Sequence, residues 1–232
     1  MPPLRFEPLL RERPWGGRRL ASWGKPLLPG TSIGESWEIS DRPDAQSVVA
    51  EGLYKGRTLR DLIEEHGPAL LGTALDKGSF PLLIKLLDAT TWLSIQVHPS
   101  AETAGKGEQP KTEAWYVLEG GEILLGLCEG ASPETLRGEH PEKSLRHFSV
   151  RPGDAVLVPA GAPHAIGPGV LLAEIQENSD TTHRLHDWGR KGRSLHVEQA
   201  IRDIRACPPI QPPAPLEEEG LSSSPFSLSR RE

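Results

Sequence analysis

Residues 92–98 read WLSIQVH, and this stretch decides the class of fold. Its alternation puts two sets of side chains on opposite faces of a strand, Ser94, Gln96 and His98 on one face and Leu93, Ile95 and Val97 on the other. The same two-residue period recurs from residue 82 in LLIKLL, AWYVLEG, EILLGL, DAVLVPA and VLLAEIQ. Short strands at such intervals are typical of a β-sandwich or barrel. We therefore predict a mainly β protein with a barrel core over about residues 82–200.

The segments outside this core have different patterns. Residues 58–71, TLRDLIEEHGPALL, carry apolar residues at helical spacing behind a threonine that can cap the first turn, which predicts one short helix. Residues 208–232 are rich in proline, serine and charge, which predicts a flexible tail. The length of 232 residues and the absence of an internal repeat favour a single domain over residues 1–207.

The composition argues against several classes of partner. Lysine and arginine are scattered and the net charge is -6, so no basic stripe is available for nucleic acid. No apolar run approaches the roughly 20 residues of a membrane helix, and the first residues lack the features of a secretory signal. Cys128 and Cys207 lie far apart without CxxC spacing. We therefore expect a cytoplasmic protein, either monomer or dimer.

Two stretches carry polar residues with the spacing of a shared metal site. The first holds Gln96 and His98 and then Glu113, and the second runs from Gly153 through PAGAPH to His164. The pair resembles the two motifs of the cupin superfamily, in which neighbouring strands of a small barrel converge on one metal. The first motif departs from that pattern, because glutamine replaces the usual first histidine and residues 99–112 separate His98 from Glu113.

Those departures direct the resemblance to one family. QVHP, KTEAWY, PAGAPHAI and EIQENSDTTHRLHDWGR, together with RPWGG, GESWEIS and PLLIKLLDA, are similar to the short bacterial form of type I phosphomannose isomerases over roughly residues 5–200. The resemblance implies a cupin barrel (a double-stranded β-helix, or jelly roll). It also implies a metal-dependent enzyme that interconverts mannose 6-phosphate and fructose 6-phosphate through an enediol. Its short members usually carry a further C-terminal β domain, where this chain has the proline-rich stretch.

The resemblance implies that Gln96, His98, Glu113 and His164 are the metal ligands. Two imidazoles, a carboxylate and an amide oxygen suit a single zinc ion and leave a position open for water or a sugar oxygen. Cupins hold iron, manganese or nickel on similar ligands, so other divalent transition metals remain open.

The same motifs imply acid–base residues for the proton transfer. Lys85, Lys111 and Asp180 are the candidates, and Lys111 is favoured because it lies two residues from Glu113 on the same strand face. A nearby divalent cation would lower the pKa of Lys111 towards working pH. Glu174 is expected to face the same interior.

Cationic and hydroxyl groups are implied at the phosphate end of the substrate, where charge-assisted bonds fix its orientation. The candidates are Ser94, Arg184 and Arg190, and Arg184 can instead steady the enediolate. His183 and His186 replace tyrosines of the family motif, so we expect them to pack or to lie at the rim.

Two other functions stay open at this point. A metal-bound cupin that binds a sugar phosphate without turnover would need the same residues. An iron oxygenase is less favoured because Gln96, Lys111 and Arg184 are retained.

Overall fold

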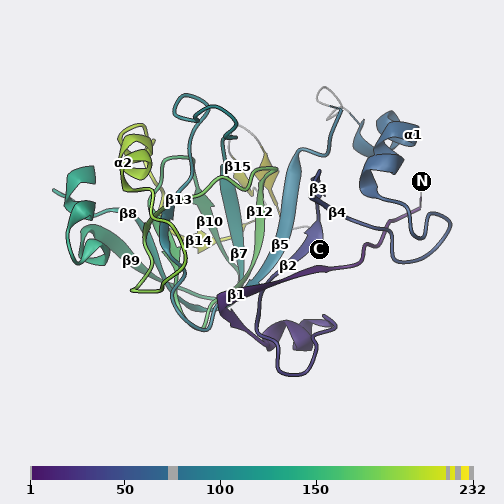
Figure 1. The fold of residues 1–232 in the computed structure, drawn as a ribbon, viewed down its shortest axis with the longest axis horizontal. Helices are drawn as coiled ribbons and strands as arrows, with labels where there is room; N and C mark the ends of the chain where they lie inside the picture. The colour runs from purple at the N-terminus through teal and green to yellow at the C-terminus, as the bar shows by residue number, and fades with distance from the viewer. Residues whose placement is uncertain (1, 73–77, 218–219, 223–225, 230–232) are drawn as a thin grey trace.

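The computed structural model describes residues 2–72, 78–217, 220–222 and 226–229. It confirms the mainly β fold, built on two antiparallel sheets (Figure 1). In spatial order the seven-stranded sheet contains β1 (Leu9–Gly17), β2 (Ile33–Ile39), β5 (Leu82–Asp88), β12 (Leu171–Glu177), β7 (Glu113–Glu119), β10 (Asp154–Val158) and β14 (Ala214–Pro215). The five-stranded sheet contains β13 (His183–His186), β6 (Ile95–Val97), β11 (His164–Ile166), β8 (Gly121–Leu127) and β9 (Leu145–Val150).

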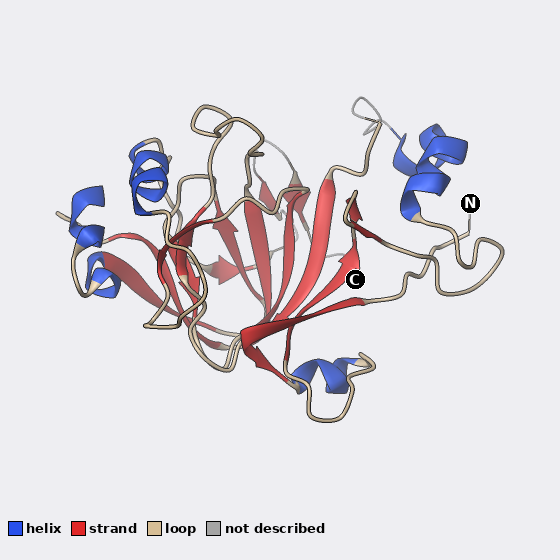
Figure 2. Ribbon diagram, viewed as in Figure 1, coloured by secondary structure: helices blue, strands red, loops and turns tan. Residues whose placement is uncertain are grey.

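The remaining elements lie at the periphery of the strands (Figure 2). They are the helices α1 (Leu59–Leu71) and α2 (Val197–Arg205), the short 3-10 helices η1 (Arg19–Trp23), η3 (Pro133–Arg137) and η4 (Pro141–Ser144), and the two-stranded pairs β3 (Asp41–Arg42) with β4 (Ala45–Gln46) and β15 (Leu221–Ser222) with β16 (Ser227–Leu228). None of the helices in the described part of the chain has the length and apolar character needed to span a membrane.

Helix α1 confirms the helix predicted from residues 58–71. Thr58 caps it, because its hydroxyl accepts from the backbone N–H of Asp61 at 3.1 Å while the Asp61 carboxylate accepts from the N–H of Thr58 at 2.9 Å. This reciprocal pair satisfies two N–H groups that the first turn leaves without partners. Leu59, Leu62 and Ile63 are buried, as the periodicity predicts.

Strand β6 is shorter than the alternation predicted. Ile95 and Val97 pack in an apolar cluster with residues of α2, but Leu93 belongs to a different cluster that includes Trp15 and Trp115. The prediction that Leu93 shares a face with Ile95 and Val97 is therefore wrong. The reason is that regular strand geometry begins only at Ile95, so the two-residue period does not extend back to Leu93.

Segments on both sides of the predicted core also join the larger sheet. β2 pairs with β5, so the first two strands extend the sheet that holds much of the predicted core. At the other end, Ala214 and Pro215 pair with β10 inside the stretch expected to be a tail. The division into a domain over 1–207 and a flexible tail remains a prediction.

Candidate active site

Three predicted ligands meet in the interior of the molecule. His98 directly follows β6, Glu113 begins β7 and His164 begins β11. One ligand atom from each lies within 4.8 Å of the others, and all three side chains are buried. The pairing of β11 with β6 also sets His164 opposite Gln96.

Both histidines present an unprotonated nitrogen to this centre. His98 Nδ1 donates to the carbonyl of Thr181 and His164 Nδ1 donates to the carbonyl of Ala162, each at 2.9 Å. The two Nε2 atoms then face the Glu113 carboxylate at 3.3 and 3.4 Å. Burial and the charge of Lys111 lower the pKa of His98 to about 3, and burial lowers the pKa of His164. Both rings therefore present an unprotonated Nε2 beside the Glu113 carboxylate, as metal-ligating histidines do, and Lys111 Nζ lies 3.3 Å from Nε2 of His98.

Glu113 supplies the negative charge. Burial alone would raise its pKa, but Lys111 and His98 hold the pKa of Glu113 well below its usual range. Trp115 Nε1 donates to Oε1 at 3.1 Å. Oε2 is buried and accepts no well-aligned hydrogen bond, although Lys111 Nζ lies 2.7 Å away as an ion-pair partner. Glu113 is thus a buried, ionised carboxylate beside two imidazole nitrogens, which fits a metal ligand.

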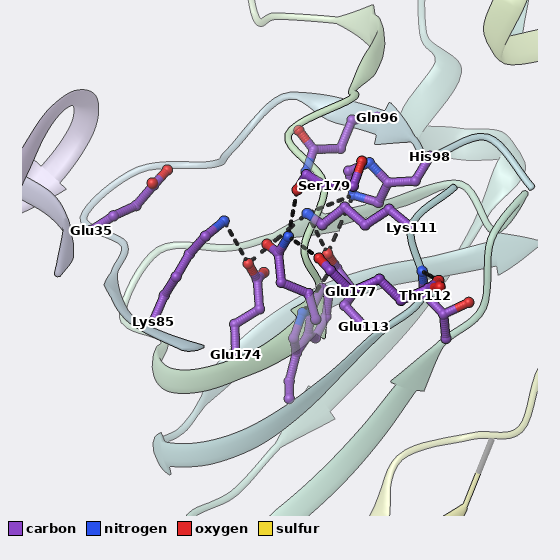
Figure 3. A network of polar contacts seen from close by, with 12 residues as sticks. Glu35, Lys85, Gln96, His98, Lys111, Thr112, Glu113, Glu174, Glu177 and Ser179 are labelled. Atoms are coloured by element: carbon purple, nitrogen blue, oxygen red, sulfur yellow. Dashed lines mark hydrogen bonds and ion pairs between the residues drawn. The ribbon is translucent and has the colours of Figure 1, made fainter. Parts of the chain in front are cut away.

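Gln96 lies beside these groups, as Figure 3 shows. Its amide nitrogen lies 3.2 Å from His164 Nε2, and its oxygen accepts from the Ser94 hydroxyl at 3.2 Å. Rotating the amide by half a turn would bring the oxygen to the centre. The Ser94 hydroxyl supports both orientations, since it can donate or accept.

Charges of alternating sign continue from the centre (Figure 3). Lys111 Nζ lies 4.0 Å from Glu174 Oε1, which in turn accepts from Lys85 Nζ at 2.9 Å. Burial lowers the pKa of Lys111, but Glu113 and Glu174 more than offset this and raise it. The lowered pKa expected for Lys111 is therefore not produced by the protein's own charges and would require a bound cation.

A cavity of about 440 Å³ opens on these residues. Six of the predicted site residues line it, namely Lys85, Ser94, Gln96, Lys111, Asp180 and Arg184. Glu174 lines it too, as expected. The cavity brings acid–base, ligand and cationic candidates to a single space.

Arg190 is not among the residues that line this cavity. Its guanidinium donates to the Asp187 carboxylate at 2.8 and 3.1 Å and to the carbonyl of Trp92 at 2.9 Å. The substrate-binding role of Arg190 thus stays a prediction from the sequence.

Several lining residues had no role in the sequence analysis, among them Arg13, Glu35, Arg193 and His196. Glu35 accepts from Arg13 at 2.8 and 3.1 Å and from Trp37 Nε1 at 2.7 Å. Burial would raise the pKa of Glu35, but the charges of Lys85 and Arg13 lower it to about 2. Arg13 and Glu35 lie within the motifs RPWGG and GESWEIS, which mark the region without indicating which side chains reach the cavity.

His183 is buried, and both of its ring nitrogens contact carboxylates. Nδ1 lies 2.5 Å from Asp203 of α2, and Nε2 lies 2.9 Å from Glu108 in the segment between His98 and Glu113. We call these three residues the His183 bridge. The expected packing role is compatible with its burial, but the two carboxylate partners were not foreseen.

Comparison with known proteins agrees with this geometry. The family model described as phosphomannose isomerase type I, catalytic domain, matches residues 4–129. The chain is 44% identical to the mannose-6-phosphate isomerase ManA of Bacillus subtilis, over 87% of this chain and 68% of that protein. It is 41% identical to the mannose-6-phosphate isomerase of Streptococcus mutans, over 97% and 76%. The crystal structure of the mannose 6-phosphate isomerase from Bacillus subtilis superposes with a TM-score of 0.83 at 35% identity, over 97% of this chain and 74% of that one.

Proposed function

This chain belongs to the type I phosphomannose isomerase family and has its sugar-phosphate isomerase activity, and we propose that the reaction takes place beside His98, Glu113 and His164. The expected cupin fold and enzyme class are confirmed by the same relatives. The observation that carries the location is the convergence of two unprotonated imidazole nitrogens on a buried, ionised carboxylate.

Zinc is the ion we propose for this centre. Two neutral imidazoles and one carboxylate form the kind of donor set that catalytic zinc sites use, with Gln96 as a fourth ligand once its oxygen is turned inwards. The bound ion would polarise a sugar oxygen or organise the water that does so. Backbone carbonyls of Thr181 and Ala162 orient the two rings.

Lys111 is the acid–base residue that we favour. The reaction moves a proton between C1 and C2 of an open-chain sugar, so a group must exchange protons within the cavity. We call His98, Glu113 and His164 the metal centre. Lys111 contacts Glu113 of this centre and lines the cavity, and Glu174 lies between Lys111 and Lys85. Asp180 lines the same space and raises the pKa of Lys111 through its charge. These contacts support Lys85 and Asp180 as relay groups.

Arg184 is proposed to stabilise negative charge on the reacting sugar. Its Nε is buried without a hydrogen-bond partner, and Nη1 donates only to the carbonyl of Ser194 at 2.9 Å. Within the described part of the chain Arg184 forms no ion pair, so its charge is available to an enediolate or a phosphate. Ser94, whose hydroxyl contacts Gln96 and which lines the cavity, is proposed to contact the substrate.

One assay separates turnover from binding. The purified protein is incubated with mannose 6-phosphate in deuterated water, and fructose 6-phosphate formation and deuterium at C2 are both measured. We expect both, together with their loss on chelation and their recovery with zinc. Tight binding of mannose 6-phosphate without product or exchange would favour the binding protein instead.

A further inference from the structure

We propose that Arg13, Arg193 and His196 form the site that holds the phosphate of the substrate, in the cavity that Arg184 also lines. The inference rests on the proposed function and adds residues that the family motifs did not indicate. It also assigns Arg190 a supporting position in place of direct contact.

The first step is location. Arg13 on β1, Arg193 in the loop after β13 and His196 just before α2 all line the cavity that contains Lys111. Arg13 is held by Glu35, and Figure 3 shows Lys85 and Glu174 between Glu35 and the metal centre. The cavity therefore has a metal end and a separate cationic end, as a sugar with its reacting carbons and its phosphate at opposite ends requires.

The second step is charge. Two carboxylates are paired with three of the four arginines near this end, Glu35 with Arg13 and Asp187 with both Arg190 and Arg193. Arg184 has no such partner among the described residues. Over the whole cavity lining, five cationic side chains face four acids, Glu12, Glu35, Glu174 and Asp180, so positive charge is in excess by one. Burial lowers the pKa of Arg193, and the charge of Arg184 lowers it further. A phosphate, with a charge near -2 at neutral pH, would relieve this repulsion.

The third step is the set of hydrogen-bond donors. His196 Nδ1 accepts from the backbone N–H of Arg184 at 3.3 Å, so the ring proton is on Nε2. Burial and the charge of Arg184 lower the pKa of His196, which keeps it a neutral donor. Arg193 is fixed by Asp187 at 3.1 and 3.3 Å. These contacts orient the donors before an anion arrives, which reduces the ordering cost of binding.

The neighbouring acids do not cancel the site. The Glu35 carboxylate already accepts two bonds from Arg13 and one from Trp37. Asp187 is engaged by Arg190 and Arg193, while the carbonyl of Trp92 fixes Arg190 from the other side. Arg190 thus acts through Asp187, as a positioning residue for Arg193.

Arg193→Gln tests this assignment. We expect KM for mannose 6-phosphate to rise by about 10- to 100-fold, the effect of losing one or two hydrogen bonds to a charged group, with a smaller change in kcat. The inhibition constant of inorganic phosphate should rise in parallel. Arg193→Lys should fall between, since it keeps the charge without the planar fork. Arg5→Gln is the matched control, because Arg5 is exposed and does not line the cavity.

Two results are decisive. Parental KM and parental phosphate inhibition in both Arg193 variants would overturn the site. Should the parent protein fail to isomerise mannose 6-phosphate, the proposed function fails. Binding of inorganic phosphate by calorimetry, weakened in Arg193→Gln and unchanged in Arg5→Gln, then decides this inference separately.

Discussion

The metal centre and the His183 bridge use the same residue types for opposite purposes. In the metal centre Nδ1 of His98 and Nδ1 of His164 each donate to a backbone carbonyl, so both rings turn an unprotonated Nε2 towards Glu113. In the bridge a single imidazole lies between two carboxylates, and each of its ring nitrogens contacts one of them. The first cluster thus offers two ring nitrogens to an added cation, whereas both ring nitrogens of the bridge are already engaged by carboxylates.

The difference shows that residue type alone does not identify a metal site. What matters is whether one ring nitrogen donates to a backbone carbonyl and leaves the other unprotonated, or whether both nitrogens contact carboxylates. The bridge instead joins α2, β13 and the segment that leads to Lys111, because Glu108 and Asp203 come from different parts of the chain. We therefore expect mutations in the two clusters to affect different properties.

The largest effect should come from Glu113→Gln, which removes the anionic ligand and keeps its shape. Metal affinity should fall by at least about 10-fold and isomerase activity by about 10³-fold, since a metal supplies several kcal/mol of charge stabilisation. Metal content after mild chelation and kcat/KM are the measurements. Unchanged metal occupancy would remove Glu113 from the ligand set and with it one side of the comparison.

Arg184→Ala should have the next largest effect. Losing one contact to developing negative charge costs about 10²-fold in rate. Because Arg184 is not a ligand, metal content and the melting temperature should stay at the parental values. A variant that keeps most of its activity towards mannose 6-phosphate would show that the cavity assignment is wrong even with the metal in place.

Glu35 extends the comparison to a carboxylate neutralised by the protein's own cations. Its folded-state pKa of about 2 is below the ordinary 4.5, so its stabilisation is fully present above about pH 4.5 and is lost as pH falls towards 2. At neutral pH it is on the order of 3 kcal/mol. The free energy of unfolding, measured with urea across this pH range, should fall more steeply with decreasing pH in the parent than in Glu35→Gln. Equal slopes would mean that the ion pair with Arg13 does not form in solution.

Asp203→Asn should give the smallest change and sharpen the contrast most. The bridge would lose one charged partner of His183, and we expect a decrease of about 1–3 kcal/mol in the free energy of unfolding. Metal content and kcat should be unaffected. Glu198→Gln, on the same helix, is the control: it loses only an exposed ion pair with Arg137 and should lower the free energy of unfolding by less than about 1 kcal/mol. Loss of metal in Asp203→Asn would mean that the two clusters are coupled.

Much of the fold was predictable because period-two alternation is local. The alternating runs at β5, β6, β7, β8, β10 and β12 were found, and so was α1 through its cap, whereas the six-residue β9 was not. β11 was not identified as a strand, since it is only three residues long, and α2 was absorbed into the predicted barrel. Pairing of β2 with β5 is non-local and leaves no signal in either segment.

The site was predictable to the extent that motifs specify it. The four ligands and Lys111 follow from resemblance, and the structure brings them together. The His183 bridge was not predictable, because its acids lie 75 and 20 positions away along the chain. The choice between Arg190 and Arg193 depends on how Asp187 and the carbonyl of Trp92 are oriented, which no spacing encodes.

A crystal structure of the protein with zinc, using anomalous scattering at the zinc edge, tests the central claim most directly. We predict one strong peak within bonding distance of Nε2 of His98, Nε2 of His164 and a Glu113 oxygen, with no peak at the His183 bridge. A zinc peak at the His183 bridge would contradict it. So would the absence of zinc at His98, Glu113 and His164 in crystals of enzymatically active protein.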